Sequence, residues 1–212
     1  MRFASRQDAG RELGEFLSQR GVTADLILGL PRGGVVVAAE VARRLKLPLD
    51  VLAVRKIGHP LQREFAVGAL AEPDYVFLHE RSLEEYPVEP AGLEEVIAEE
   101  KLRLHEYARR FHLRGMPPLR GKNVLLIDDG LATGATTEAA VRSARQQKSR
   151  HIAVAAPVAS VEAVARLGQI ADAVEVIFID SEFQAVGQYY LDFTQTTDAE
   201  VMELLRAAQG EK

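Results

Sequence analysis

Two adjacent acids, Asp128 and Asp129, follow a run of apolar residues and precede a short turn of small and hydroxyl residues. The stretch reads Val124-Leu125-Leu126-Ile127-Asp128-Asp129-Gly130-Leu131-Ala132-Thr133-Gly134-Ala135-Thr136. The apolar run predicts a buried strand, and a turn that opens a helix exposes backbone N–H groups that can bind a phosphate. Thr133, Thr136 and Thr137 would add hydroxyl donors, and Gly134 would let the backbone approach a ligand closely.

Asp128 and Asp129 need a reason of their own, because a phosphate site is built from donors and not from carboxylates. Together they can accept hydrogen bonds from neighbouring ribose hydroxyls and hold a hydrated cation. Phosphate donors beside acceptors for a diol indicate a sugar phosphate as the ligand. The structural alternative is that the acids only end a strand and the threonines only cap a helix.

A second loop that could carry charge is Leu28-Gly29-Leu30-Pro31-Arg32-Gly33-Gly34, between an apolar run and an apolar helix. Its glycines lack the G-x-G-x-x-G spacing, and no ribose-binding acid follows at the expected distance, so a dinucleotide-binding loop is disfavoured. An ordinary turn with a surface arginine is the plain alternative.

A third charged segment, Arg55-Lys56, follows an apolar run and precedes Ile57-Gly58-His59-Pro60. The charges and chain breakers predict an exposed loop here. Solvation alone would also account for two charges after a strand.

The elements that must position these segments have the pattern of an α/β protein. Strands are expected at 25–30, 49–54, 67–70, 75–78, 123–127, 152–156 and 173–179, and helices at 5–20, 35–45, 93–113, 135–147, 161–167 and 198–208. The alternation in the second half predicts a largely parallel sheet covered on both faces. In such sheets, ligands lie at the carboxyl ends of the strands.

Length and composition narrow the function classes. At 212 residues, with 47% hydrophobic and 27% charged residues, the chain suits one main folding unit. A net charge of -5 argues against a broad nucleic-acid surface, and the absence of cysteine excludes disulfides and thiolate chemistry. Without an apolar leader or a run of roughly 18 apolar residues, we expect a cytoplasmic protein that does not contact the membrane.

The thirteen-residue stretch resembles the phosphoribosyl pyrophosphate signature of the type I phosphoribosyltransferases, and the resemblance extends over about 26–193. It implies a magnesium-dependent transfer of ribosyl phosphate to a nitrogenous base with release of pyrophosphate. The implied fold is a three-layer α/β domain, with a mostly parallel sheet, an antiparallel edge strand and a C-terminal hood at about 181–212. We therefore expect a single domain over 1–212 with a long helix inserted at about 93–113.

The resemblance also implies roles for particular residues. Asp128 and Asp129 would contact the ribose hydroxyls and hold magnesium, directly or through water. The 5′-phosphate would lie on the loop formed by Gly130, Leu131, Ala132, Thr133, Gly134, Ala135 and Thr136. The first loop, with Arg32, Gly33 and Gly34, would meet the pyrophosphate.

Catalysis would also draw on Arg55 and Lys56, which the resemblance places where a basic residue neutralises the leaving group. The loop at 57–67 would be mobile and would close over the substrate. Closure matters because the transition state resembles an oxocarbenium ion that water must not capture.

The acceptor base is less defined. Relatives that act on hypoxanthine or guanine carry an acid at the position of Ala132, so the resemblance favours an adenine- or uracil-like base over a 6-oxopurine. Phe183 in the hood is the candidate for stacking on the base, whereas Tyr189 and Tyr190 fit core positions better. Many relatives are dimers or tetramers, which makes a homo-oligomer an option, although no pattern in this sequence indicates one.

As a whole, the chain resembles the uncharacterised predicted phosphoribosyltransferases, through 31–34, 64–69 and 183–190. A non-catalytic protein that senses phosphoribosyl pyrophosphate stays open as an alternative. A phospho-receiver domain is disfavoured, because its paired acids follow the first strand, whereas Asp128 and Asp129 lie past the middle of the chain and precede a phosphate loop.

Overall fold

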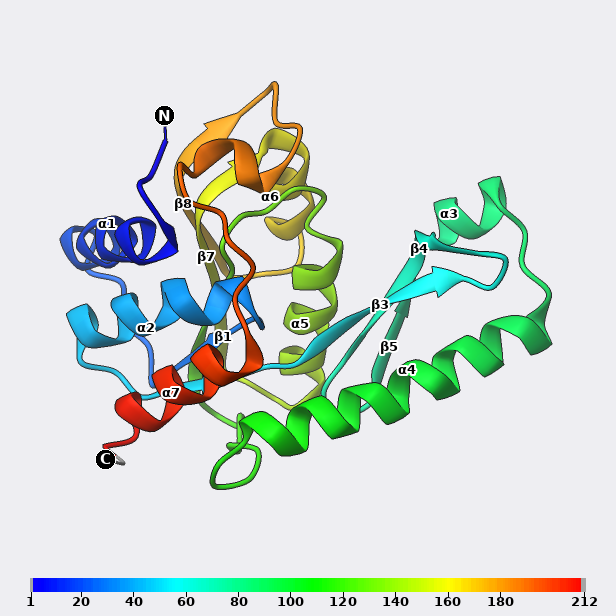
Figure 1. The fold of residues 1–212 in the computed structure, drawn as a ribbon, viewed down its shortest axis with the longest axis horizontal. Helices are drawn as coiled ribbons and strands as arrows, with labels where there is room; N and C mark the ends of the chain where they lie inside the picture. The colour runs from blue at the N-terminus through cyan, green and yellow to red at the C-terminus, as the bar shows by residue number, and fades with distance from the viewer. Residues whose placement is uncertain (1, 211–212) are drawn as a thin grey trace.

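The computed structural model describes residues 2–210 and consists of a body with an arm that projects from it (Figure 1). The body is built on a five-stranded sheet in the order β2-β1-β6-β7-β8. Its strands are β1 (Leu26–Gly29), β2 (Leu49–Val51), β6 (Asn123–Ile127), β7 (His151–Ser160) and β8 (Ala173–Asp180). All neighbouring pairs are parallel. The runs of Val, Leu, Ile and Ala in β1, β6 and β7 suit strands that are buried on both faces.

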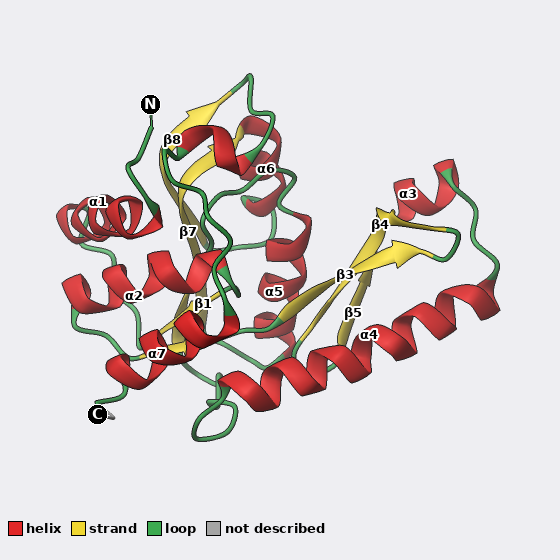
Figure 2. Ribbon diagram, in the orientation of Figure 1, coloured by secondary structure: helices red, strands yellow, loops and turns green. Residues whose placement is uncertain are grey.

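Helices cover both faces of this sheet (Figure 2). One layer contains α1 (Arg6–Gln19), α2 (Gly33–Leu45) and α7 (Asp198–Ala208), and the other contains α5 (Ala135–Gln146) and α6 (Val161–Leu167). The first layer buries residues such as Leu13, Val41 and Leu205 against the sheet, and the second buries Val141 and Leu167. The predicted three-layer α/β architecture is confirmed.

The arm is a three-stranded antiparallel sheet backed by a long helix. It comprises β3 (Val54–His59), β4 (Gln62–Ala71), β5 (Tyr75–Leu78), α3 (Glu80–Glu85) and α4 (Pro90–Phe111). Ile57, Val67 and Leu70 of the strands pack with Val96 and Leu104 of α4. The sheet of the arm also meets the body through contacts of β4 with α5.

Two expectations need correction here. The antiparallel pairing expected at the edge of the main sheet lies in the separate sheet of the arm, and every pair in the main sheet is parallel. The segment at 57–67, expected as a loop, forms most of the β3–β4 hairpin, with its turn between His59 and Gln62. The sequence of this segment has the pattern of a loop because many of its residues are charged and exposed. Ile57 and Val67, however, are fully buried against α4.

The chain after β8 passes back over the body. It contains the 3₁₀-helix η1 (Val186–Tyr189), an extended stretch and then α7. The N–H of Phe3 donates to the oxygen of Tyr189 at 2.8 Å, and the N–H of Leu191 donates to the oxygen of Phe3 at 2.8 Å. The start of the chain is thereby paired with the C-terminal segment.

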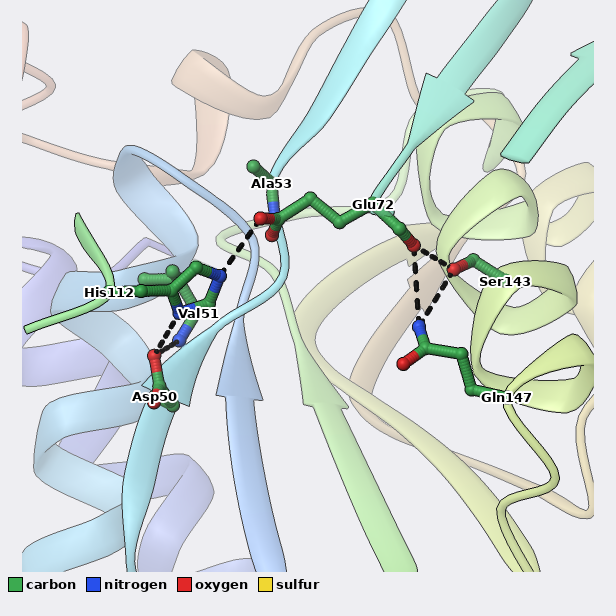
Figure 3. A network of polar contacts seen from close by, with 7 residues as sticks. All are labelled: Asp50, Val51, Ala53, Glu72, His112, Ser143 and Gln147. Carbon is green, nitrogen blue, oxygen red and sulfur yellow. Dashed lines mark hydrogen bonds and ion pairs between the residues drawn. The ribbon is translucent and has the colours of Figure 1, made fainter. Parts of the chain in front are cut away.

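The root of the arm is held by one buried histidine (Figure 3). His112, just after α4, lies between Asp50 of β2 and Glu72 at the β4–β5 turn, with 2.9 Å from Nδ1 to Asp50 Oδ1 and 2.9 Å from Nε2 to Glu72 Oε1. Glu72 also accepts from the N–H of Ala53 at 2.6 Å. Burial favours the neutral imidazole, but hydrogen bonds and charges of the two carboxylates outweigh it and raise the pKa of His112 to about 9.

The main-chain oxygen of Glu72 extends this network to the body. It accepts hydrogen bonds from the hydroxyl of Ser143 and, at 3.3 Å, from the side-chain amide of Gln147 (Figure 3). The arm is therefore joined to β2 and to the C-terminal end of α5 through a single polar network. No helix among the described residues is long and apolar enough to cross a bilayer.

Candidate active site

The candidate site lies where the strand order of the main sheet reverses direction. β1 and β6 are neighbours, and Gly29 at the end of β1 is paired with Ile127 at the end of β6. The helix after β1 covers one face of the sheet, and the helix after β6 covers the other (Figure 1). Such a switch point opens a crevice at the carboxyl ends of the strands, where α/β proteins bind ligands.

The loop after β6 is pinned by the neighbouring strand. Leu131 forms a parallel bridge with Ala159 of β7, and the hydroxyl of Ser160 donates to the oxygen of Ala132 at 2.5 Å. Gly134 has a positive φ of 72° and packs against Ala163 at the start of α6, which favours glycine at this position.

The first turn of α5 faces solvent with its donors available to a ligand. The N-cap residue Gly134 has no side chain to cap α5, although the N–H of Ala135 donates to Thr133 Oγ1 at 3.4 Å. Thr133 and Thr136 are exposed. A helix N-terminus next to exposed hydroxyls has the donors and the dipole that bind a phosphate. Thr137, expected as a further donor, is instead buried, and its hydroxyl points to Asp128 Oδ2 at 3.4 Å.

The two acids lie half-buried beside this loop. Asp128 Oδ1 accepts from the N–H of Asp129 at 2.9 Å. Burial, and then the charge of Asp129, raise the pKa of Asp128 to about 8. A cation beside the two acids would favour the charged form of Asp128, which burial and the charge of Asp129 disfavour.

The first loop packs directly on the acids. The N–H of Leu30 donates to the oxygen of Ile127 at 2.9 Å, and the peptide bond between Pro31 and Arg32 is cis. A β-carbon at Gly34 would lie 2.6 Å from the oxygen of Ile127, and one at Gly33 would lie 1.9 Å from Asp129 Oδ2. Both glycines are therefore required by close approach between the two loops.

Arg32 and Arg55 both act electrostatically on one residue, Tyr107. Burial and the charge of Asp198 raise the pKa of Tyr107, and Arg32, Arg55 and Arg110 act in the opposite direction. Arg32 lies 3.7 Å from Asp198 at the start of α7, and Arg55 donates to Glu100 at 2.5 Å. Each of the two arginines that the sequence singled out thus has a carboxylate partner on a helix, α7 for Arg32 and α4 for Arg55.

Lys56 is placed differently, although it is adjacent to Arg55 in the sequence. Its Nζ donates to the main-chain oxygen of Glu64 at 3.0 Å and lies 3.7 Å from the carboxylate of that residue. It is therefore bound within the β3–β4 hairpin and has no contact with Asp128 or Asp129 in this conformation.

Comparison with known proteins agrees with this geometry. A model of the phosphoribosyl transferase domain matches residues 5–194. The chain belongs to the phosphoribosyltransferase family. Proteins from two strains of Mycobacterium tuberculosis, provisionally named phosphoribosyl transferases, are each 42% identical over 207 residues, which is 97% of this chain and 47% of the relative. The chain therefore spans about half the length of these curated relatives.

Solved structures share the fold of this chain. The crystal structure of TT1426 from Thermus thermophilus has a TM-score of 0.81 and 45% identity, and the match covers 97% of this chain and 98% of that one. A purine phosphoribosyltransferase from Pyrococcus horikoshii has a TM-score of 0.50 and 17% identity, with 87% and 96% covered. At that identity, the second likeness shows the fold alone.

The C-terminal segment that was expected to form a hood contains the predicted stacking residue. Phe183 is half-buried, and its ring lies 5.0 Å from that of Tyr189 at an interplanar angle of 33°. Tyr189 and Tyr190 are buried, as the sequence indicated. Tyr190 additionally donates from its hydroxyl to the main-chain oxygen of Asp129 at 2.5 Å, so the hood reaches the acid pair.

Two sizeable cavities are lined by other residues than those of the acid and phosphate loops. One, of about 720 Å³, lies between the start of α1 and α7 and includes Arg6 and Thr194 in its wall. The other, of about 520 Å³, lies on the arm between the β3–β4 hairpin and α4 and includes Arg55 and Lys56. Within the acid and phosphate loops, Thr133 and Thr136 are exposed, whereas Gly130, Leu131 and Gly134 are buried.

Sequence reasoning missed one residue of this phosphoribosyltransferase site. Arg6, at the first position of α1, donates from Nε to Asp129 Oδ2 at 2.6 Å. The two residues are 123 positions apart, and the local pattern around Arg6 is that of an ordinary helix start. Arg6 reaches Asp129 because the N-terminal segment pairs through Phe3 with the C-terminal segment around Tyr190.

Proposed function

We propose that this phosphoribosyltransferase binds phosphoribosyl pyrophosphate and magnesium and transfers ribose 5-phosphate to a nitrogenous base. The observation that carries the proposal is the packing of two loops across neighbouring strands. The loop after β1 contains Arg32 and begins α2, and the loop after β6 contains the two acids and begins α5. The interaction of Gly33 with Asp129 places these loops in direct contact.

In the proposed complex, the first turn of α5 binds the 5′-phosphate, with Thr133 and Thr136 as hydroxyl donors. Asp128 and Asp129 accept hydrogen bonds from the two ribose hydroxyls and fix the orientation of the sugar. Pyrophosphate extends toward the start of α2, where Arg32 and the neighbouring Arg55 supply positive charge.

The reaction breaks the bond between ribose C1 and a pyrophosphate oxygen and forms a bond between C1 and a ring nitrogen of the base. The bonding pair leaves with pyrophosphate, and the nitrogen releases its proton. Charge develops on the leaving group, so Arg32 and Arg55 would stabilise the transition state more than the ground state. Lys56 would also stabilise the charge on the leaving pyrophosphate, once a movement of the β3–β4 hairpin has separated it from Glu64.

Magnesium fits the acid pair. Asp128 and Asp129 supply hard oxygen ligands. The pKa of Asp128 is raised first by burial and then by the charge of Asp129, and a bound divalent cation would offset that charge. Among the described residues, no cluster of three or more His, Cys, Asp or Glu side chains could hold a metal by itself. Magnesium usually takes one or two carboxylates together with waters and substrate phosphates, so two acids suffice. When bound, it would neutralise charge on the pyrophosphate.

The proposed acceptor is an adenine- or uracil-like base stacked beside Phe183. Ala132 offers no carboxylate at the position that would serve a 6-oxopurine, which supports this choice. Cytoplasmic location and assembly into a homo-oligomer stay predictions. We also predict that neither a nucleic acid nor a membrane is a partner.

The test is pyrophosphate release from phosphoribosyl pyrophosphate and magnesium in the presence of adenine, uracil, hypoxanthine or guanine, each supplied separately. We expect release with adenine or uracil and little with the other two. Tight binding of phosphoribosyl pyrophosphate without release in the presence of any base would favour the sensing protein. The proposal would be overturned if the protein neither bound phosphoribosyl pyrophosphate nor released pyrophosphate with any of these bases.

A further inference from the structure

A buried ion pair joins the first helix to the acid pair. Arg6 Nε and Asp129 Oδ2 are 2.6 Å apart, and the two side chains are only 11% and 15% exposed. A bond of this length between charged groups is stronger than one between neutral groups. Breaking it by removing one partner leaves the other charge buried without compensation.

The guanidinium of Arg6 is oriented from several sides by the C-terminal segment. Its NH1 donates to the main-chain oxygen of Thr194 at 2.8 Å, and its central carbon lies 3.9 Å from the centroid of the Phe193 ring. Donation in the plane and stacking across the plane together require an arginine, because lysine has neither the fork of donors nor the flat face.

Asp129 is also enclosed on its other sides. Its main-chain oxygen accepts from Tyr190, and its carboxylate touches the position where a β-carbon of Gly33 would lie. That same β-carbon would lie 2.7 Å from Arg6 Nε. The ion pair therefore lies at the junction of the first loop, the acid loop and the hood.

We propose that Arg6 is a positioning residue for phosphoribosyl pyrophosphate, which deepens the proposed function and rests on it. Arg6 holds Asp129 through Oδ2 and directs Oδ1 toward a ribose hydroxyl. It also offsets one of the two adjacent negative charges without occupying the space where the sugar binds. The orientation of the acid is thus set by residues from both ends of the chain.

The test compares Arg6→Gln, Arg6→Lys and Phe193→Leu with the unchanged protein, by titration calorimetry with phosphoribosyl pyrophosphate and magnesium. Arg11→Gln is the matched control, because Arg11 lies in the same helix, is 58% exposed and pairs with Asp8. We expect Arg6→Gln to weaken binding about tenfold or more, because the charged hydrogen bond to Asp129 is lost. Arg6→Lys should recover part of the affinity, and Arg11→Gln should bind as the unchanged protein does.

Turnover separates positioning from a contribution to folding alone. With the base that the unchanged protein uses, Arg6→Gln should raise KM for phosphoribosyl pyrophosphate and lower kcat, and leave KM for the base unchanged. A folded Arg6→Gln protein with unaltered affinity and kinetics would overturn the role of Arg6. If that variant does not fold, unaltered affinity in both Arg6→Lys and Phe193→Leu would overturn it. Absence of binding in the unchanged protein would instead overturn the proposed function itself.

Discussion

Gly33 and Asp129 are packed so closely that a β-carbon at position 33 would lie 1.9 Å from a carboxylate oxygen of the acid. The atoms nearest to that β-carbon, Asp129 Oδ2 and Arg6 Nε, end two side chains that are paired with each other at 2.6 Å. The first loop and the acid loop are therefore in contact before any ligand binds.

Gly33→Ala should separate the two loops. Either Asp129 turns away from Arg6 or the start of α2 moves outward, and we expect a fall in kcat/KM of about 10²-fold from misplacement of the acid. Overpacking should also lower the free energy of unfolding by about 1–3 kcal/mol. Steady-state kinetics and thermal unfolding measure these two effects.

Gly92→Ala is the control for that substitution. Gly92 lies in the first turn of α4, and its β-carbon would meet its nearest neighbour, Pro60, at an ordinary 3.5 Å. This variant should keep full activity. Equal losses in the two variants would contradict the close contact of Gly33 with Asp129.

Asp129→Asn should abolish most turnover while leaving the fold intact. The amide can still accept a hydrogen bond from Arg6, but it lacks the charge that supports the ribose contact and the cation, so we expect a fall in pyrophosphate release of about 10²-fold or more. Asp74→Asn, on the exposed β4–β5 turn, is the control. Full turnover by Asp129→Asn with an unchanged circular dichroism spectrum would rule out the assigned role.

Arg32→Ala should weaken binding of pyrophosphate more than binding of a ribose 5-phosphate product. The guanidinium is the charge at the start of α2, and loss of a charged hydrogen bond should raise the dissociation constant of pyrophosphate roughly tenfold. Arg43→Ala, an exposed change at the end of the same helix, should have no effect. Indistinguishable dissociation constants for the two variants would remove Arg32 from the pyrophosphate site.

The stability of the protein should decrease as the pH rises from about 6.5 to above 9. The pKa of His112 is raised from 6.5 to about 9, so the folded state binds the proton more tightly than the unfolded state. The resulting stabilisation is fully present below 6.5 and disappears as the pH passes through about 9. At 1.36 kcal/mol per unit, it amounts to roughly 3 kcal/mol.

Urea unfolding across this pH range measures the effect. His112→Gln should reduce the pH dependence of the unfolding free energy, whereas His105→Gln, at a histidine that is 48% exposed, should retain it. A pH profile that His112→Gln leaves unchanged would mean that the proton is not held between Asp50 and Glu72.

The elements with strong local signals were predicted well from the sequence. β6 at Asn123–Ile127, α6 at Val161–Leu167 and α7 at Asp198–Ala208 occur at the expected residues. β6 is a continuous apolar run between polar ends. The side chains of Ser160 and Thr197 cap the N-termini of α6 and α7. Periodicity and capping are local properties, so the sequence alone contains them.

The β4–β5 hairpin of the arm was predicted, whereas the β3–β4 hairpin and the polar contacts between distant segments were not. The sequence of β3 resembles a loop because it contains the adjacent charges Arg55 and Lys56. Pairing with β4 and burial of Ile57 under α4 make it a strand. Arg6 and His112 have partners far along the chain, and nothing in their immediate sequence indicates them. Of the candidate site, the two loops and the acids could be identified from the sequence, whereas the contacts that orient Asp129 required the fold.

Pairing of Phe3 with the segment around Tyr190 makes the first few residues an anchor for the acid loop. Proteolytic trimming of residues 1–6, or a bulky fusion that prevents this pairing, would remove the guanidinium from Asp129 without altering any residue of either loop. A purification tag joined after α7 would keep this anchor intact.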